Sequence, residues 1–438
     1  MAPHQTPVDN DAPSSKQSVD LIIFAAHIIP VIPRDVVLSD HAIVVANSRI
    51  VALLPRNEAV RLYVGTEERH LPDHIVMPGL VNLHTHSAMT LLRGLSDDKA
   101  LCDWLAQDIW PTESSVLEQT GMRGTVGQVI MEFPGPYGSG PDDYFAKAKP
   151  NLEKYAPGNH DLITAAMAPH APYTVSEKSL QRAEELAKEH KARVHIHLHE
   201  TEGECCDSEN LNRSSMSCHL SDQKLRPLAN FKRLGLLSER LVCAHMTQLT
   251  GEEMDEVAKA GAHVAHCPSS NLKLASGIAP VTEMIKRGVN VGIGTDGAAS
   301  NNSLDMFAEM KLAAILAKAQ TLQSSSVPAG EALQMATLNG ARALGLEKDI
   351  GSIEVGKRAD VIAVECDSIE MIPMYNAVSH VVYVAGREHV SDVWINGKHL
   401  LANHQLTTID EAQVKKDVRG WATRICGHHN ELQQKTEQ

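Results

Sequence analysis

Val81-Asn82-Leu83-His84-Thr85-His86 decides the fold, because an apolar run here ends in two histidines one residue apart. Side chains alternate between the two faces of a strand, so His84 and His86 share a face at the carboxyl end of a predicted strand. Active sites of βα barrels are built at that end of the strands. The stretch therefore predicts a barrel strand that delivers two imidazoles to a candidate site.

A second predicted strand, residues 193–198, carries the same pattern more strongly. His195, His197 and His199 fall on one face, while the residues between them are apolar and fall on the other. An apolar outer face can pack on helices and leave imidazoles pointing inward. A role in supporting the ligands or in packing remains an alternative for His195 and His199.

Two further predicted strands end in residues that bind metals. His245 closes the run 241–244, and Asp296 closes the run 289–295, in which Gly292 and Gly294 leave space beside the carboxylate. Neutral imidazoles and one carboxylate suit a cation such as Zn²⁺, and three or four protein ligands with one open position are typical of a catalytic site. A lone His-x-His pair is often an ordinary surface pair. The coincidence of several strand ends favours the metal site.

Between about residues 75 and 346, apolar runs alternate with helical stretches such as 176–190 and 303–319, which predicts βα units. A closed barrel needs eight strands, and the sequence offers seven candidates: Ile75–Leu83, Met122–Ile130, Leu162–Ala168, Arg193–Leu198, Leu241–Ala244, Ala262–Ala265 and Val289–Ile293.

The two ends of the chain are rich in short β-branched runs. We expect residues 20–74 and 347–406 to form one small, discontinuous β-sandwich domain around the barrel at 75–346. Asn396-Gly397 is a strong hairpin signal within it. Residues 1–19 are predicted to be a flexible tail. Residues 407–438 are predicted to form a docked C-terminal helix capped at Thr408, with one apolar face made of Val414, Val418, Trp421 and Ile425.

Composition narrows the classes of protein. Hydrophobic residues make up 43% of the 438 residues and the formal net charge is −14, so a globular protein that does not bind nucleic acid is expected. The eight cysteines show no pair spacing for a disulfide framework, which favours a reducing, cytoplasmic location. No apolar run reaches the roughly 20 residues of a membrane helix, so no membrane partner is expected.

Taken in order, five motifs resemble those of the 5-methylthioadenosine/S-adenosylhomocysteine deaminase family of the amidohydrolase superfamily, which is related to the triazine chlorohydrolases. The resemblance runs from about residue 20 to about residue 406 and rests on the stretches Met77–His86, Ala168–Tyr173, His197–Thr201, His266–Asn271 and Gly294–Gly297.

The resemblance implies roles for individual residues. His84, His86, His197 and Asp296 would hold one Zn²⁺ per chain, with Fe²⁺ or Mn²⁺ less favoured. Glu200 would pass a proton to a ring nitrogen, Asp296 would accept one from the attacking water, and His245 would polarise that water or the developing oxyanion. Glu113 would bind ribose hydroxyls and His170 would contact the purine. A solvated strand-end acid and a helix-cap acid are the alternatives for Glu200 and Glu113.

The chain departs from the family pattern in two places. Only residues 114–121 stand where a helix and a strand are expected, and eight residues cannot supply both. The polar stretch 205–224 is an apparent insertion that could act as a lid. The predicted fold is therefore an α/β, TIM-type (β/α) barrel of the metal-dependent hydrolase class that lacks one βα unit.

The predicted function is zinc-dependent hydrolytic deamination of an adenosine-type nucleoside to its inosine analogue and ammonia. No arginine pair is evident for an amino-acid carboxylate, which favours 5-methylthioadenosine or adenosine over S-adenosylhomocysteine. Two alternatives stay open: another heterocycle hydrolase, such as a chlorohydrolase, and a catalytically impaired relative that lacks a barrel unit. Homo-oligomerisation is also left open.

Overall fold

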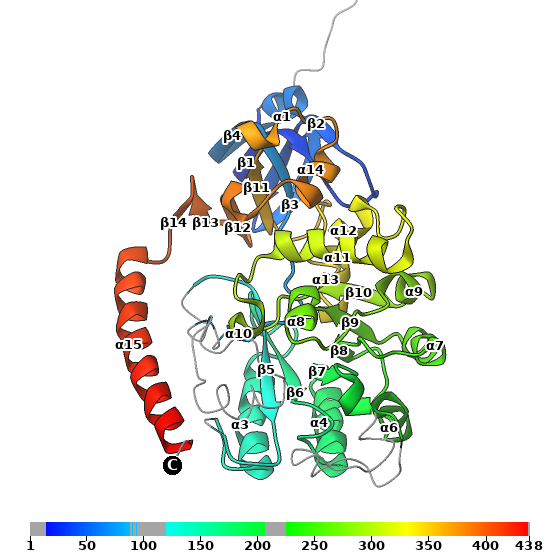
Figure 1. The fold of residues 1–438 in the computed structure, drawn as a ribbon. Coiled ribbons are helices and arrows are strands. Elements are labelled where there is room, and N and C mark those ends of the chain that lie inside the picture. Colours follow the sequence, from blue (N-terminus) through cyan, green and yellow to red (C-terminus); the bar gives the residue numbers. More distant parts are fainter. Residues whose placement is uncertain are drawn as a thin grey trace, which may run out of the picture.

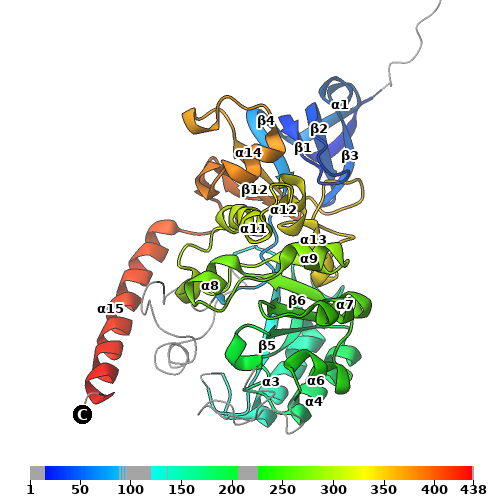
Figure 2. The ribbon, with the colours of Figure 1, turned by 45° about the vertical axis from the view of Figure 1, so that its right-hand side comes forward.

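The computed structural model describes residues 15–87, 90, 93, 120–135, 137–205 and 225–436. Two sheets organise the chain, one in a β-rich part at the top of Figure 1 and one in the helix-covered part below it. A long C-terminal helix, α15 (Glu411–Thr436), stands to one side of the helix-covered part in Figures 1 and 2.

The β-rich part is an eight-stranded mixed sheet in the order β14-β13-β12-β11-β4-β1-β2-β3. Both ends of the chain contribute to it, so strands separated by some 300 residues pair directly, as β4 does with β11. Its strands are β1 (Gln17–Ile28), β2 (Leu38–Ala46), β3 (Arg49–Pro55), β4 (Tyr63–Pro78), β11 (Val361–Glu365), β12 (Val390–Ile395), β13 (Lys398–Ala402) and β14 (Gln405–Leu406).

Two tight turns join strands of this sheet, and one of them was predicted from the sequence. The chain reverses between β2 and β3 at Asn47 and Ser48, whose φ angles are +51° and +66°. The predicted hairpin at Asn396-Gly397 joins β12 to β13, again with positive φ at both residues. Such two-residue turns match the twist of antiparallel strands.

The second sheet has six parallel strands in the order β10-β9-β8-β7-β6-β5. Its strands are β5 (Gly124–Ile130), β6 (Ile163–Pro169), β7 (Arg193–Leu198), β8 (Leu241–His245), β9 (His263–His266) and β10 (Asn290–Ile293). The regular alternation of these strands with helices confirms the predicted βα architecture.

Helices follow the strands and bury apolar faces against them. Ser176 caps the helix after β6 through its side chain, and Thr250 forms a capping box with Glu253 on the helix after β8. The helices between β5 and β11 are α3 (Pro141–Lys154), α4 (Glu177–Glu189), α6 (Pro227–Arg233), α7 (Gly251–Ala260), α8 (Pro268–Lys273), α9 (Val281–Lys286), α10 (Ala298–Asn301), α11 (Met306–Thr321), α12 (Ala329–Met335) and α13 (Leu338–Leu344). The β-rich part adds α1 (Arg56–Leu62), α14 (Ala377–Tyr383) and the short helices η3 (Ile369–Met371) and η4 (Arg387–His389).

The decisive stretch 81–86 lies along β10 without forming a regular strand. The amide of Leu83 donates to the carbonyl of Ile293 at 2.9 Å, and the amide of Asp296 donates to the carbonyl of His84 at 2.9 Å. These two hydrogen bonds set the register of residues 81–86 against β10, and this register places His84 beside Asp296.

The predicted first strand, Ile75–Leu83, is wrong as a single element. Residues 75–78 end β4, where Pro78 pairs with Val361 of the mixed sheet. The chain then leaves that sheet through Gly79, whose amide donates to the carbonyl of Asp360. The apolar run is continuous in sequence because its two halves are buried in different sheets.

The described residues supply no eighth parallel strand next to β5, and the short connection 114–121 lies mostly outside them. The apparent insertion 205–224, apart from Cys205, also lies outside the described residues. The prediction of a barrel that lacks one βα unit is consistent with six regular strands plus the stretch 81–86.

The C-terminal helix spans Glu411–Thr436, and the residues of its predicted apolar face remain partly exposed. Val414, Val418 and Trp421 are 47%, 42% and 48% exposed. Its cap is also different, because Asp410 accepts the amides of Ala412 and Gln413, whereas Thr408 donates to the carbonyl of Thr120. No helix among the described residues is long and apolar enough to span a bilayer.

The contact between residues 81–86 and β10 depends on Gly294. A Cβ at Gly294 would lie 2.8 Å from the backbone nitrogen of His84, whereas a Cβ at Gly124 of β5 would meet nothing closer than 4.0 Å. We expect Gly294→Ala to lower the free energy of unfolding by about 1–3 kcal/mol, because overpacking forces the backbone to shift. Urea denaturation of Gly294→Ala beside Gly124→Ala tests this, and equal stabilities would contradict the close approach.

Candidate active site

Four side chains from three distant parts of the chain meet at the carboxyl end of the parallel sheet. His84, His86, His197 and Asp296 each offer one ligand-type atom, and these atoms lie within 4.8 Å of one another. Asp296 Oδ1 lies 3.2 Å from the Nε2 atoms of both His84 and His86, and His197 Nε2 lies 3.3 Å from His86 Nε2. The structure thus brings together the four residues that the sequence proposed as ligands.

The neighbours of His197 and His84 determine which ring nitrogen of each faces the cluster. His197 donates from Nδ1 to the carbonyl of His170 at 2.6 Å, which leaves a lone pair on its Nε2. His84 Nδ1 lies 2.8 Å from His195 Nε2, so the two rings share a hydrogen bond. His84 Nε2 is buried and faces Asp296 Oδ1 at 3.2 Å. A ring nitrogen held among other ligand-type atoms, with the second ring nitrogen bonded elsewhere, is placed to bind a metal.

Asp296 is held so that one oxygen faces the imidazoles. Its Oδ2 accepts hydrogen bonds from the hydroxyls of Ser270 at 2.6 Å and Ser300 at 2.9 Å. Oδ1 is the oxygen that faces His84 and His86. Asp296 has a φ of +61°, and a non-glycine residue with this backbone conformation needs support from its surroundings. The two hydroxyls supply part of that support.

A buried acid and a buried histidine lie beside this cluster. Glu200 Oε2 is 3.8 Å from His245 Nε2, and Glu200 Oε1 accepts a hydrogen bond from Ser276 at 3.4 Å. His245 donates from Nδ1 to Asn271 Oδ1 at 2.8 Å, so its Nε2 is left as an acceptor facing the site. Both side chains are at most 4% exposed. The cluster therefore has an acid and a base within reach of one small volume.

Burial controls the protonation of these groups. It lowers the pKa of His84 to about 4 and holds the pKa of His197 well below its ordinary value, which keeps both imidazoles neutral. Burial raises the pKa of Glu200 and so favours its protonated form. Burial alone would raise the pKa of Asp296 too, but hydrogen bonds from His84 and His86 outweigh it and leave that pKa well below its ordinary value.

The other predicted site residues have different outcomes. His170 follows β6, and its ring centre lies 4.9 Å from that of His197, so it borders the cluster. Glu113 lies outside the described residues. His195 contacts His84 from behind, which agrees with the supporting role considered for it.

His199 does not share the inward face of β7 as the strand pattern predicted. The strand ends at Leu198, and His199 has a φ of +51°, which breaks the alternation. Its Nε2 accepts the amide of Leu228 at 2.9 Å, at the start of α6. His199 is a fully buried structural residue that anchors this helix.

Sequence reasoning missed several residues that support the site. Ser270, Ser300, Asn271 and Ser276 each hold a candidate catalytic side chain, and Glu204 accepts the amide of Glu200 at 2.8 Å. Ser270 and Asn271 belong to the motif His266–Asn271, and membership of that motif is the only sequence signal for their role. A single sequence gives no reason to assign such contacts to them.

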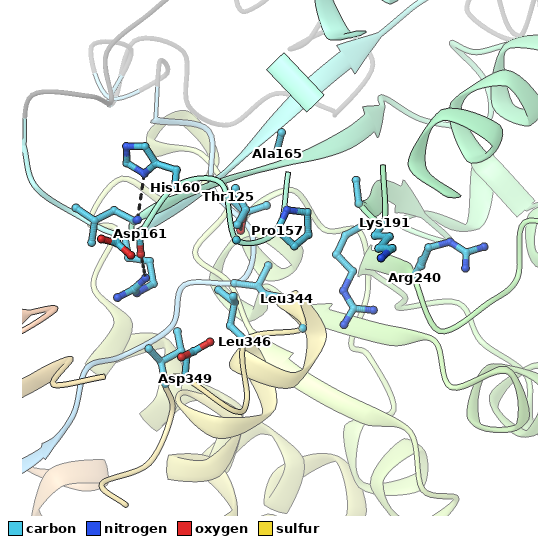
Figure 3. A pocket seen from close by; sticks show the side chains of 18 of the residues that line it. Thr125, Pro157, His160, Asp161, Ala165, Lys191, Arg240, Leu344, Leu346 and Asp349 are labelled. Carbon is cyan, nitrogen blue, oxygen red and sulfur yellow. Dashed lines mark hydrogen bonds between the residues drawn. The ribbon is translucent and has the colours of Figure 1, made fainter. Parts of the chain in front are cut away.

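A cavity of about 550 Å³ lies at the opposite end of the parallel sheet (Figure 3). Its walls include Thr125 and Arg193 at the amino ends of β5 and β7, together with Leu344 after the last barrel strand. Arg240 and Arg358, which also line it, are paired with Glu184 and with Asp161. None of the four clustered ligand-type residues lines this cavity, so it is separate from the candidate site.

The donor set fits a divalent cation of borderline softness. Three imidazole nitrogens and one carboxylate oxygen converge, and a second layer of hydrogen bonds orients them, as in metal sites generally. With an acid and a base alongside, the arrangement can activate water and move protons at a bound molecule.

Comparison with known proteins gives the class directly. The amidohydrolase family matches residues 114–400, and the chain belongs to that family of metal-dependent hydrolases. A 5-methylthioadenosine/S-adenosylhomocysteine deaminase from Teredinibacter turnerae is 37% identical over 93% of this chain and 98% of its own. One from Thermodesulfovibrio yellowstonii is 36% identical over 92% of this chain and 98% of its own.

Within the amidohydrolases, the chain is a member of the 5-methylthioadenosine/S-adenosylhomocysteine deaminase family, which confirms the resemblance seen in the motifs. An adenosine deaminase from Xanthomonas campestris, solved with bound zinc, superposes with a TM-score of 0.88 at 41% identity over 94% of this chain and 100% of its own. The atrazine chlorohydrolase TrzN from Arthrobacter aurescens gives 0.82 at 19% identity over 92% of this chain and 100% of its own, a likeness of fold alone. The chain is thus a hydrolytic enzyme of the deaminase type.

Buried neutral histidines make the metal-free protein sensitive to acid. Burial lowers the pKa of His84 to about 4 and that of His170 to about 3, from 6.5. Their contribution to stability is complete above pH 6.5 and is lost as the pH falls towards these values, because the unfolded chain takes up protons first. At pH 5 we expect a loss of roughly 2 kcal/mol for each such histidine relative to pH 7.5.

Urea denaturation of chelator-treated protein between pH 7.5 and 5 measures this dependence. His170→Gln should lose less stability over that interval than the wild type, whereas His160→Gln, at an exposed position, should follow the wild type. A stability that stays level or rises towards pH 5 would contradict the proposed neutral, buried histidines.

Proposed function

We propose that the chain hydrolyses the exocyclic amine of an adenosine-type nucleoside, giving the inosine analogue and ammonia. The observation that carries the proposal is the meeting of four ligand-type side chains with Glu200 and His245 at one strand end. The relatives at 36–37% identity bear the name of deaminases that act on 5-methylthioadenosine and S-adenosylhomocysteine. A small nucleoside is therefore the proposed substrate.

The proposed cofactor is one Zn²⁺ held by His84, His86, His197 and Asp296. The bound zinc of the adenosine deaminase from Xanthomonas campestris supports this choice over Fe²⁺ or Mn²⁺. When bound, the ion would act as a Lewis acid that lowers the pKa of a water ligand towards about 7.

The proton movements follow from the protein groups. Glu200 has a raised pKa and can carry the proton that a ring nitrogen must receive as the ring carbon becomes tetrahedral. Asp296, whose Oδ1 faces the cluster, accepts the proton of the attacking water. His245, with its proton on Nδ1, holds that water through Nε2. His170 borders the proposed purine position, and Glu113 is proposed for the ribose hydroxyls.

The orientation of Asp296 explains how it can serve both as a proposed metal ligand and as a proton acceptor. Because Ser270 and Ser300 occupy Oδ2, the ligand position and the proton-accepting position both fall on the side of Oδ1. A proton taken up there is then close to Glu200 and to the departing amine. Proton transfer by such a placed group contributes typically about 10²–10⁴-fold to a rate.

Activity should require Asp296. We expect the zinc-loaded wild type to release ammonia from 5-methylthioadenosine, followed by the ultraviolet change of the ring, and Asp296→Asn to be slower by more than about 10³-fold. His160→Gln, remote from the site, serves as the matched control and should retain full activity. Chloride release from a chlorotriazine without ammonia from any adenosine analogue would contradict the proposal.

Zinc binding should require His197 in particular. Calorimetric titration of the chelator-treated protein should give one site per chain, and His197→Ala should weaken it by more than about 100-fold, because even supporting residues of metal sites cost 10–100-fold. His160→Ala should leave the titration unchanged. Equal affinities for the two variants would remove His197 from the ligand set.

A further inference from the structure

A second buried carboxylate, Glu204, lies directly behind the proposed proton donor. Its Oε1 accepts the amide of His199 at 3.0 Å, and its Oε2 accepts the amide of Glu200 at 2.8 Å. Glu204 is 7% exposed. Two successive backbone amides that converge on one anion form a nest, which is a built anion site in the backbone. In this protein the carboxylate of Glu204 occupies the nest.

The nest lies at the turn that gives Glu200 its direction. β7 ends at Leu198, and the left-handed φ of His199 bends the chain so that Glu200 enters the site. A backbone angle of this kind persists where the surroundings hold it. Glu204 holds the two amide groups of the bend.

The carbonyl side of the same bend is held from β8. The carbonyl of His199 accepts the amides of Thr247 at 3.0 Å and Gln248 at 3.2 Å, and the carbonyl of Glu200 accepts the hydroxyl of Thr247 at 2.7 Å. Thr247 also contacts the carbonyl of Ser276, whose hydroxyl binds the Glu200 side chain. The amides and carbonyls of both residues are therefore fixed, the amides by Glu204 alone.

A neutral amide could not replace this carboxylate. Both oxygens of Glu204 accept N–H groups, so glutamine would place its own NH₂ donor against one of the two amides. No lysine or arginine pairs with Glu204 in the described chain, and burying a carboxylate is costly unless its hydrogen bonds compensate. Burial raises the pKa of Glu204 to about 7 against the opposing effect of the Glu200 and His199 amides, so above that pH its negative charge falls on the turn.

We propose that Glu204 is a positioning residue for Glu200: it holds the 199–200 turn so that the Glu200 carboxyl reaches the reacting ring. The inference rests on the proposed deamination for the role of Glu200. Glu204 contacts none of the four proposed metal ligands within the described chain. Its substitution should therefore affect catalysis and leave the metal content unchanged.

The kinetic test compares Glu204→Gln with Glu202→Gln, an exposed glutamate two residues earlier in the same helical turn. With zinc content and melting temperature matched to the wild type, Glu204→Gln should lower kcat for 5-methylthioadenosine by about 10–100-fold and change KM by less than about 3-fold. Glu202→Gln should behave as the wild type. Glu204→Asp, which keeps the charge but is one methylene shorter, should recover part of kcat.

The decisive arm repeats the substitution in a Glu200→Gln background. A residue that acts through Glu200 should there cost less than about 2-fold, because the group it positions has already lost its function. The same 10–100-fold loss in both backgrounds, or a kcat within about 3-fold of wild type in the single variant, overturns the inference.

A structural readout separates this inference from the proposed activity. Crystal structures of the wild type and Glu204→Gln should show the Glu200 carboxyl displaced from Ser276 and His245 in the variant alone. An unmoved Glu200 overturns the positioning role whatever the substrate. If Glu200 is displaced in Glu204→Gln but the wild type deaminates no nucleoside, the positioning of Glu200 is upheld and the proposed function is refuted.

Discussion

The structure depends on one constraint, the register of residues 81–86 against β10. Two backbone hydrogen bonds, from Leu83 to Ile293 and from Asp296 to His84, align the two histidines with the aspartate at the end of the strands. Gly294 allows the two backbones to approach, since any side chain there would meet His84. Because β7 reaches the same edge of the parallel sheet, His197 completes the cluster without a flexible loop.

Around this cluster, hydrogen bonds decide which atom of each side chain faces inward. Backbone and side-chain acceptors take the Nδ1 protons of His197 and His245, and two serines take one oxygen of Asp296. Burial adds to this by favouring neutral imidazoles and a protonated Glu200. The desolvation that disfavours the charged forms of these histidines also keeps their lone pairs ready for a cation, so the same groups affect both stability and function.

Much of this could be predicted from local patterns. Period-two alternation located β7 at its true bounds, the Asn-Gly turn located the β12–β13 hairpin, and strand ends pointed to His84, His86, His197 and Asp296. The failures occurred where tertiary contacts override the pattern. The run 75–83 is shared by two sheets, and His199 leaves its strand through a positive φ. Glu204 escaped notice because its partners are backbone amides, which carry no sequence signal.

The central claim is that a single cation is shared by three imidazoles and one carboxylate at this strand end. Anomalous diffraction at the zinc edge from crystals of the zinc-loaded protein tests it most directly. The account predicts one strong peak per chain, about 2.0–2.2 Å from the Nε2 atoms of His84, His86 and His197 and from Asp296 Oδ1. A peak bound elsewhere, or none between these residues in fully loaded crystals, would contradict it.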